Sequence, residues 1–252
     1  MDFGVIGGTG FYEVAEEAER IEVSTPYGIA EVTKAHLGEA QIAFLPRHGR
    51  GHSIPPHRVN YRANISALKQ LGVRNLVATA SVGSMSTAMP PGSLVTLTQF
   101  LDFTKARPST FFDGDGTEVL HVDMTEPYCP HLREELQAAA RALGEELQAR
   151  GTYVCAEGPR FETPAEIAMF RRLGGELVGM TNVPEVVLAR EAGICYAAVA
   201  AVTNWAAGIA PEPLRHQEVS DFMSAQTPRL SALFARVVAD HRDLDCTCRA
   251  MA

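Results

Sequence analysis

The chain has 252 residues, of which 46% are apolar and 21% charged, so it holds enough apolar material to bury a substantial core. Its formal net charge of −8 argues against a general binder of nucleic acid, although a few local donors can still form a small phosphate site. The sequence contains no uninterrupted run of about 18 apolar residues, so we expect no membrane helix. The N-terminus shows no signal-peptide pattern. The 5 cysteines show no metal-ligand spacing. Taken together, these features predict a cytoplasmic protein without a membrane or nucleic-acid partner.

Strands and helices alternate along the chain. In chain order, the pattern predicts strands at 3–6, 21–23, 30–33 and 41–45, a helix at 59–71, a strand at 75–79, a helix at 132–147, a strand at 151–156, helices at 166–172 and from Pro184 onward, a strand at 194–203 and a helix at 219–237. This alternation predicts one α/β domain over residues 1–240, and we treat 241–252 as a C-terminal tail.

A glycine turn, Gly7-Gly8-Thr9-Gly10, follows the first strand. A dinucleotide-binding turn has three glycines as G-x-G-x-x-G. Counted from Gly8, the third position is Glu13, an acid that would face a pyrophosphate. Two interpretations stay open: the turn holds one small anion through its N–H groups and the Thr9 hydroxyl, or it is a plain turn.

Two further strand ends carry polar or small residues. Arg47, His48, Arg50 and His52 lie within one loop after the strand at 41–45. Arginine suits phosphate oxygens and histidine adds a donor, so the loop is a candidate anion site at the edge where α/β sheets bind ligands. The turn at 80–83 contains Ser81 and can present N–H groups to the same anion.

Five segments carry a more specific signal through their order and spacing. They are Gly4–Gly10, Arg47–His52, Val59–Asn64, Ala156–Thr163 and Gly179–Ala189. The most distinctive sequences within them are Glu-Gly-Pro-Arg-Phe at 157–161 and Met-Thr-Asn-Val-Pro-Glu at 180–185. In these segments the chain resembles the trimeric family of nucleoside phosphorylases, which includes 6-oxopurine nucleoside phosphorylases and methylthioadenosine phosphorylases. The resemblance extends from residue 4 to about residue 238.

The resemblance implies a mixed, distorted and partly barrel-like sheet, and a homotrimer or a dimer of trimers with sites at the subunit boundaries. The implied phosphate ligands are Thr9, Arg47, His48, Ser81 and Thr181, with His52 nearby. Met180 would pack under the ribose, Phe161 would contact the base, and His121 would reach into a neighbour's site. Phosphate is then a co-substrate, and no metal or organic cofactor is required.

Two positions bear on the purine. The adenine-directed relatives have Thr-Asp-x-Asp after the long apolar strand and a serine after the Phe of Gly-Pro-Arg-Phe, whereas this chain has Thr203-Asn204-Trp205-Ala206 and Glu162. Asn204 can donate to O6 of a 6-oxopurine and accept from a protonated N7, with Trp205 and Ala206 beside it. Glu162 can accept from N1–H. We therefore expect inosine and guanosine as substrates, with Asn204 and His48 as the catalytic residues.

The group at the ribose 5′ position is less constrained by the sequence. Arg215-His216-Gln217-Glu218-Val219 resembles a segment of the 6-oxopurine enzymes whose histidine meets the 5′-hydroxyl, but the alignment needs a gap. The alternatives are a methylthioinosine or methylthioadenosine phosphorylase and, in another class, a nucleoside-binding protein without turnover.

Cys246-Thr247-Cys248 is a separate feature near the C-terminus. It is interpreted as two tail thiols, a local disulfide or an inter-chain bond.

Overall fold

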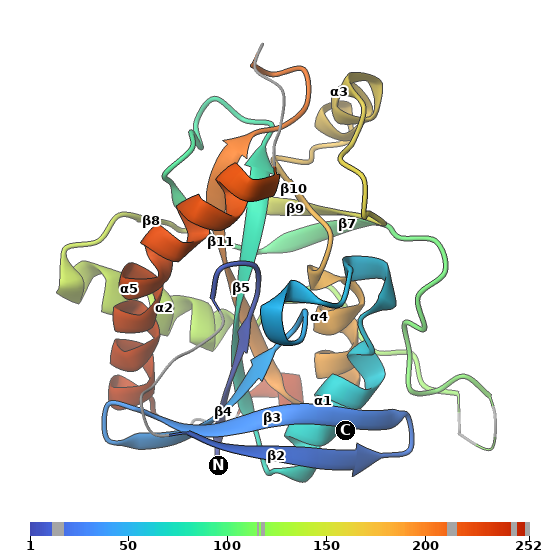
Figure 1. Ribbon diagram of the computed structural model, residues 1–252, viewed down its shortest axis with the longest axis vertical. Helices are drawn as coiled ribbons and strands as arrows, with labels where there is room; N and C mark the ends of the chain where they lie inside the picture. The colour runs from blue at the N-terminus through green and yellow to red at the C-terminus, as the bar shows by residue number, and fades with distance from the viewer. Residues whose placement is uncertain (12–17, 115, 117–118, 211–215, 243–245, 250–252) are drawn as a thin grey trace.

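A mixed, branched sheet organises the computed structural model, which describes residues 1–11, 18–114, 116, 119–210, 216–242 and 246–249 (side chains of 216–218 excepted) (Figure 1). Its strands are β1 (Phe3–Gly7), β2 (Ala18–Thr25), β3 (Gly28–Leu37), β4 (Ala40–Pro46), β5 (Asn75–Ser84), β6 (Leu94–Thr96), β7 (Gln99–Phe103), β8 (Leu147–Gln148), β9 (Thr152–Ala156), β10 (Leu177–Gly179) and β11 (Cys195–Trp205). The main order is β2-β3-β4-β1-β5-β10-β9-β7, and β5 also pairs with β11, which leads to β6 and β8.

The branch occurs at the long strand β5. β11 pairs in parallel along the whole of β5, β1 pairs in parallel with its first residues, and β10 pairs antiparallel with its last two. The sheet therefore changes partners where β5 and β11 end. The α/β class and the mixed, distorted sheet expected from the sequence are confirmed.

Two pairs of helices cover the sheet. α1 (Tyr61–Gln70) packs against α4 (Asn182–Glu191), and α2 (Pro130–Leu143) packs against α5 (His216–Asp240), on the opposite side of β5 (Figure 1). α3 (Pro164–Arg172) lies near β7 and β9. None of the described helices is both long and apolar enough to span a bilayer.

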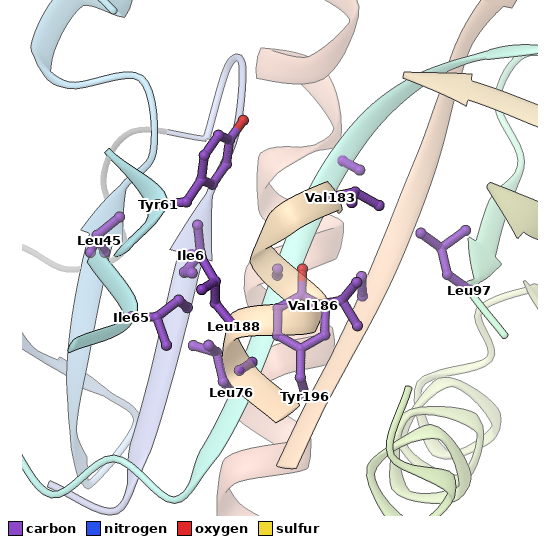
Figure 2. Close-up of a cluster of buried hydrophobic side chains, with 14 of the residues drawn as sticks. Ile6, Leu45, Tyr61, Ile65, Leu76, Leu97, Val183, Val186, Leu188 and Tyr196 are labelled. Carbon is purple, nitrogen blue, oxygen red and sulfur yellow. The ribbon is translucent and has the colours of Figure 1, made fainter. Parts of the chain in front are cut away.

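The buried strands alternate their side chains between two cores. On β1, Ile6 joins the core beneath α1 and α4, whereas Val5 joins the core beneath α2 and α5. Figure 2 shows the first core, in which Ile6, Leu76 and Val186 meet. Because both faces are covered, the strands are apolar throughout, as expected for parallel strands.

The predicted elements largely match the observed ones. The helix predicted at 132–147 is wrong at its end: Gly144 adopts φ 69° and caps α2, and Leu147 lies in β8. The short strands β6, β7, β8 and β10 were not predicted, because two to five residues carry too little periodicity to be recognised.

Candidate active site

A cavity of about 330 Å³ opens where several strands end. β1, β4, β5, β10 and β11 all deliver residues from their C-terminal ends, the edge at which α/β sheets bind ligands. The lining residues are Gly8, Thr9, Arg47, His48, His52, Pro55, Pro56, Ser81, Val82, Gly83, Pro159, Phe161, Glu162, Val178, Gly179, Met180, Thr181, Thr203, Asn204, Ala206 and Val219. Four of the five sequence segments singled out above therefore converge on one cavity, whereas Val59–Asn64 does not contribute to its lining.

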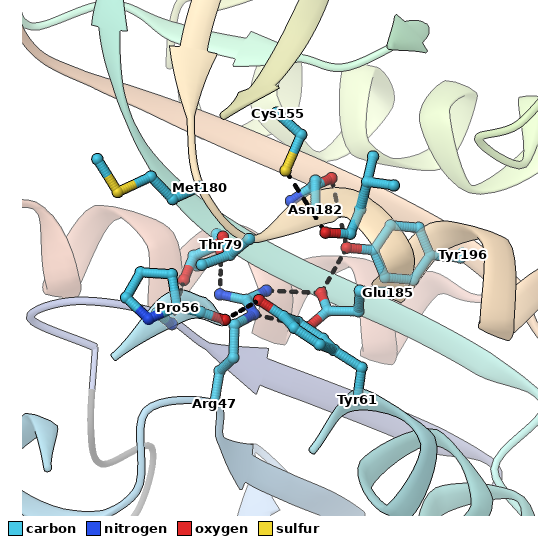
Figure 3. A network of polar contacts seen from close by, with 12 residues as sticks. Arg47, Pro56, Tyr61, Thr79, Cys155, Met180, Asn182, Glu185 and Tyr196 are labelled. Carbon is cyan, nitrogen blue, oxygen red and sulfur yellow. Dashed lines mark hydrogen bonds and ion pairs between the residues drawn. The ribbon is translucent and has the colours of Figure 1, made fainter. Parts of the chain in front are cut away.

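Arg47 is held by a carboxylate that the sequence analysis left without a role in the site. Its Nε and Nη2 each donate to Glu185 at 2.6 Å, and Nη1 donates to the Thr79 carbonyl at 3.0 Å (Figure 3). Burial disfavours the charged guanidinium, but the adjacent Glu185 outweighs it and raises the pKa of Arg47. The ion pair thus fixes both the orientation and the charge of Arg47.

A short polar chain continues behind Glu185. The Tyr196 hydroxyl donates to Glu185 at 2.7 Å (Figure 3). The Tyr128 hydroxyl donates to Asn182 Oδ1 at 3.1 Å. Burial raises the pKa of Tyr196, so its hydroxyl keeps the proton that it donates. Glu185 belongs to the Met-Thr-Asn-Val-Pro-Glu segment, and that position was the only sequence signal for it.

Small groups surround Arg47 at the cavity wall. Gly8 N–H donates to Thr79 Oγ1 at 2.9 Å, and a Cβ on Gly8 would lie 3.0 Å from Arg47 Nη1, so the turn passes close to the guanidinium. Ser81 Oγ is buried without a hydrogen-bond partner. Thr181 precedes α4, and its side chain makes no capping bond. Ser81 and Thr181 both line the cavity, so their hydroxyls are candidates to bond a ligand oxygen there.

His48 and His52 form a ring pair beside this region. Their centroids lie 4.3 Å apart, and His48 Nδ1 lies 2.9 Å from the Ile54 carbonyl oxygen. A carbonyl only accepts, so Nδ1 of His48 carries a proton. Both rings line the cavity.

Glu162 also lines the cavity. Its residue surface is only 9% exposed, and its Oε1 is buried without a partner. Burial raises the pKa of this carboxyl, with Glu166 adding to the shift. A buried carboxyl oxygen without a partner is a candidate acceptor for a ligand that carries a hydrogen-bond donor.

Asn204 is positioned by a break in strand pairing. The register of β11 against β5 shifts between Val202 and Asn204, which re-aims the side chain. Thr203 Oγ1 donates to Asn204 Oδ1 at 2.6 Å, and Asn204 Nδ2 donates to the Trp205 carbonyl at 2.8 Å. One amide N–H and one oxygen lone pair are left for a ligand.

Arg107 is a second residue that the sequence analysis missed. Its guanidinium donates to the carbonyls of Met180 at 2.8 Å, Val183 at 2.8 Å and Glu157 at 2.7 Å. It therefore joins the segment after β10 to the segment after β9, on which Phe161 and Glu162 lie. Its loop carried no pattern to mark it out.

Two predicted residues, Trp205 and His121, are not in the cavity lining, and the side chain of a third is not described. Trp205 touches the site only through the carbonyl that holds Asn204. His121 is exposed, in the segment before α2. The side chain of His216 lies outside the described residues, although Val219, one turn further along α5, lines the cavity.

Comparisons with known proteins agree with this geometry. The phosphorylase superfamily matches residues 2–239. The 6-oxopurine nucleoside phosphorylase of Pyrococcus furiosus is 50% identical over 252 residues, covering 97% of this chain and 95% of its own. A probable S-methyl-5′-thioinosine phosphorylase of Methanopyrus kandleri is 50% identical over 238 residues, covering 94% and 91%.

A solved structure has the same fold. Methylthioadenosine phosphorylase from Schistosoma mansoni in complex with adenine superposes with a TM-score of 0.91 and 35% identity, covering 94% of this chain and 91% of that one. This protein therefore belongs to the phosphorylase superfamily, and its relatives there are nucleoside phosphorylases.

Proposed function

We propose that this enzyme cleaves 6-oxopurine ribonucleosides, inosine and guanosine, with inorganic phosphate, releasing the free base and ribose 1-phosphate. The observation that carries the proposal is that one cavity is lined both by Glu162 and Asn204, which suit a purine, and by Arg47 and Ser81, which suit phosphate. Relatives named as 6-oxopurine nucleoside phosphorylases support it.

Phosphate would bind beside Arg47 in the cavity. Thr9, Ser81 and Thr181 supply hydroxyls, and Arg47 and His48 supply N–H donors. Two N–H groups of the Arg47 fork remain after its bonds to Glu185 and Thr79, one each on Nη1 and Nη2. The ion pair with Glu185 keeps these donors in place before phosphate arrives.

The base would bind between Glu162 and Asn204. Adenine presents an amino group at C6, whereas hypoxanthine and guanine present an oxygen there and an N–H at N1. The Asn204 amide donates to O6 and its oxygen accepts from N7–H, while Glu162 accepts from N1–H. A site that leaves such groups unpaired with the wrong base discriminates by up to about 10⁴-fold.

The chemistry follows from these positions. Glycosidic cleavage builds positive charge on the sugar and negative charge on the purine. Asn204 stabilises the leaving purine, and the phosphate held at Arg47 and His48 offsets the charge at C1′ before bonding to it. Neither step uses a metal or an organic cofactor.

The active form would be a homotrimer or a dimer of such trimers in the cytoplasm. The family resemblance implies that each His121 would then lie at a neighbour's cavity, and this residue is exposed and outside its own cavity lining. Light scattering gives the subunit number. Restored activity when a His121→Ala chain is mixed with an inactive Arg47 variant supports the shared site, and its absence rejects it.

The substrate is tested by comparing inosine, guanosine, adenosine and methylthioinosine, each with and without phosphate. The proposal expects phosphate-dependent release of hypoxanthine and guanine. A clear preference for methylthioinosine supports the second candidate, which the apolar Val219 in the lining and the Methanopyrus relative favour. Tight nucleoside binding without turnover would identify a binding protein.

A further inference from the structure

Four cysteines meet at the end of the molecule opposite the cavity. Cys129 precedes α2, Cys195 begins β11, and Cys246 and Cys248 lie near the C-terminus. Their Sγ atoms all lie within 4.8 Å of one another, and Cys129 Sγ lies 3.6 Å from Cys246 Sγ. The sequence spacing showed no metal-ligand pattern because three separate segments contribute.

The distances suit a tetrahedral ion. Zinc–thiolate bonds of about 2.3 Å place the sulfur atoms of a tetrahedral site about 3.8 Å apart. The cluster needs only a small contraction to reach that spacing. A pair of disulfides would instead require two sulfur pairs to close to about 2.05 Å.

The backbone around the cluster is tied down. Cys129 N–H donates to the Tyr196 carbonyl at 2.7 Å, which places the start of α2 beside the start of β11. Arg249 N–H donates to the Cys246 carbonyl at 2.9 Å, and Arg249 Nη2 donates to Asn75 Oδ1 at 2.9 Å. Cys129, Cys195 and Cys248 are each no more than 2% exposed.

Zinc binds cysteine as the thiolate. Cys129 occupies the N-cap position of α2, where the helix dipole stabilises negative charge. A buried thiolate is unfavourable unless a cation compensates it.

We propose that Cys129, Cys195, Cys246 and Cys248 bind one Zn²⁺ as a tetrathiolate site that fastens residues 246–249 to α2 and β11. Binding releases the remaining thiol protons to solvent and involves no change of oxidation state. The site is structural, because Cys195 and Asn204 lie at opposite ends of β11, roughly 30 Å apart along the strand.

A second group of ligand-type side chains lies on α2 and at the end of α5. His131, Glu135 and His241 have ligand atoms within 4.8 Å of one another. His241 Nδ1 already lies 2.9 Å from Glu135 Oε2, and these side chains are partly exposed. The experiment must therefore separate the two groups.

The test is the metal content of the full chain purified with reductant and without chelator. We expect about one zinc per chain, and Co²⁺ in its place should give thiolate charge-transfer and tetrahedral d–d bands. Cys246→Ser combined with Cys248→Ser should abolish the bound zinc and the Co²⁺ bands. This variant should also have a lower Tm, with kcat for inosine retained. Cys155→Ala, which removes the fifth cysteine, should keep the metal, as should His131→Ala combined with His241→Ala.

Three results would overturn the proposal. One is reduced protein that shows five reactive thiols in denaturant yet takes up no Zn²⁺. Another is a thiol count that reveals disulfides among the four cysteines in protein purified without oxidant. The third is zinc that persists in the double serine variant. Because Cys246 and Cys248 lie near the chain end, that variant is expected to fold.

Discussion

Glu185 and Arg47 form a buried two-point ion pair at the base of the cavity, with both N···O distances at 2.6 Å. The side chains of Arg47 and Glu185 are 0% and 1% exposed, respectively. This pair connects α4 to the end of β4, so the helix that follows Thr181 and the loop that carries His48 are held to each other. It makes Glu185 a positioning residue for phosphate under the proposed function.

Replacing Glu185 tests that position. Glu185→Ala leaves the Arg47 charge buried and uncompensated, which we expect to lower the free energy of unfolding by about 3–5 kcal/mol. Glu185→Gln keeps one acceptor and should fold, with a raised KM for phosphate and a smaller change in KM for inosine. Denaturant unfolding and steady-state kinetics measure the two effects.

A matched control lies on the same helix. Glu191 is a buried acid of α4 that accepts from Thr110 and from Phe111 N–H, outside the cavity lining. Glu191→Gln is expected to lower stability without raising the KM for phosphate. An equal rise in both variants would assign the effect to α4 in general and reject the role of Glu185.

Asn204 should dominate the chemical step. Asn204→Ala removes the interaction with the leaving purine, and we expect kcat/KM for inosine to fall by about 10²–10³-fold. Asn204→Asp should shift preference toward 6-aminopurines, because a carboxylate accepts from an amino group. Trp205→Phe is the control, since Trp205 contributes its backbone carbonyl. Near-normal phosphorolysis by Asn204→Ala contradicts the assignment.

Glu162 should make both activity and stability depend on pH. Burial raises its pKa, so the folded state binds a proton that the unfolded state has lost. The free energy of unfolding from this group therefore falls as pH rises from the ordinary glutamate range through the raised value. Glu162→Gln is expected to raise the Tm of the ligand-free protein at pH 7, measured by calorimetry.

Glu162→Gln should also lower activity with a substrate that binds through the Glu162 carboxylate. Ionised Glu162 accepts from N1–H, so kcat/KM for guanosine is expected to rise with pH through the raised pKa. In Glu162→Gln this rise of kcat/KM with pH should disappear. The value of kcat/KM should fall more for guanosine than for inosine, because guanine adds a 2-amino donor. An unchanged pH profile would place Glu162 outside base recognition.

Arg107 is expected to act through the carbonyls that it joins. Arg107→Lys keeps the charge but loses the planar fork, so we expect a higher KM for nucleoside with a modest loss in kcat. Arg160→Lys is the control, because Arg160 forms an exposed pair with Glu166 and should leave stability nearly unchanged. If both variants bind nucleoside equally well, Arg107 does not position the site.

The sequence by itself determined the class of the fold, the family and most of the cavity lining. Apolar runs such as β11 identify buried strands, and motifs such as Arg47-His48 and Met180-Thr181 lie at strand ends that meet at one sheet edge. Local patterns suffice there, because strand periodicity and glycine turns depend on neighbouring residues.

Only the tertiary structure decided which distant residues meet. Arg47 and Glu185 are 138 residues apart, and Cys129 and Cys246 are 117 apart, so no local spacing predicts either contact. The branch of the sheet at β5 and the bulge before Asn204 arise from strand pairing across the whole chain. Buried charges and thiols require partners because water cannot solvate them, and the fold supplies those partners from other segments.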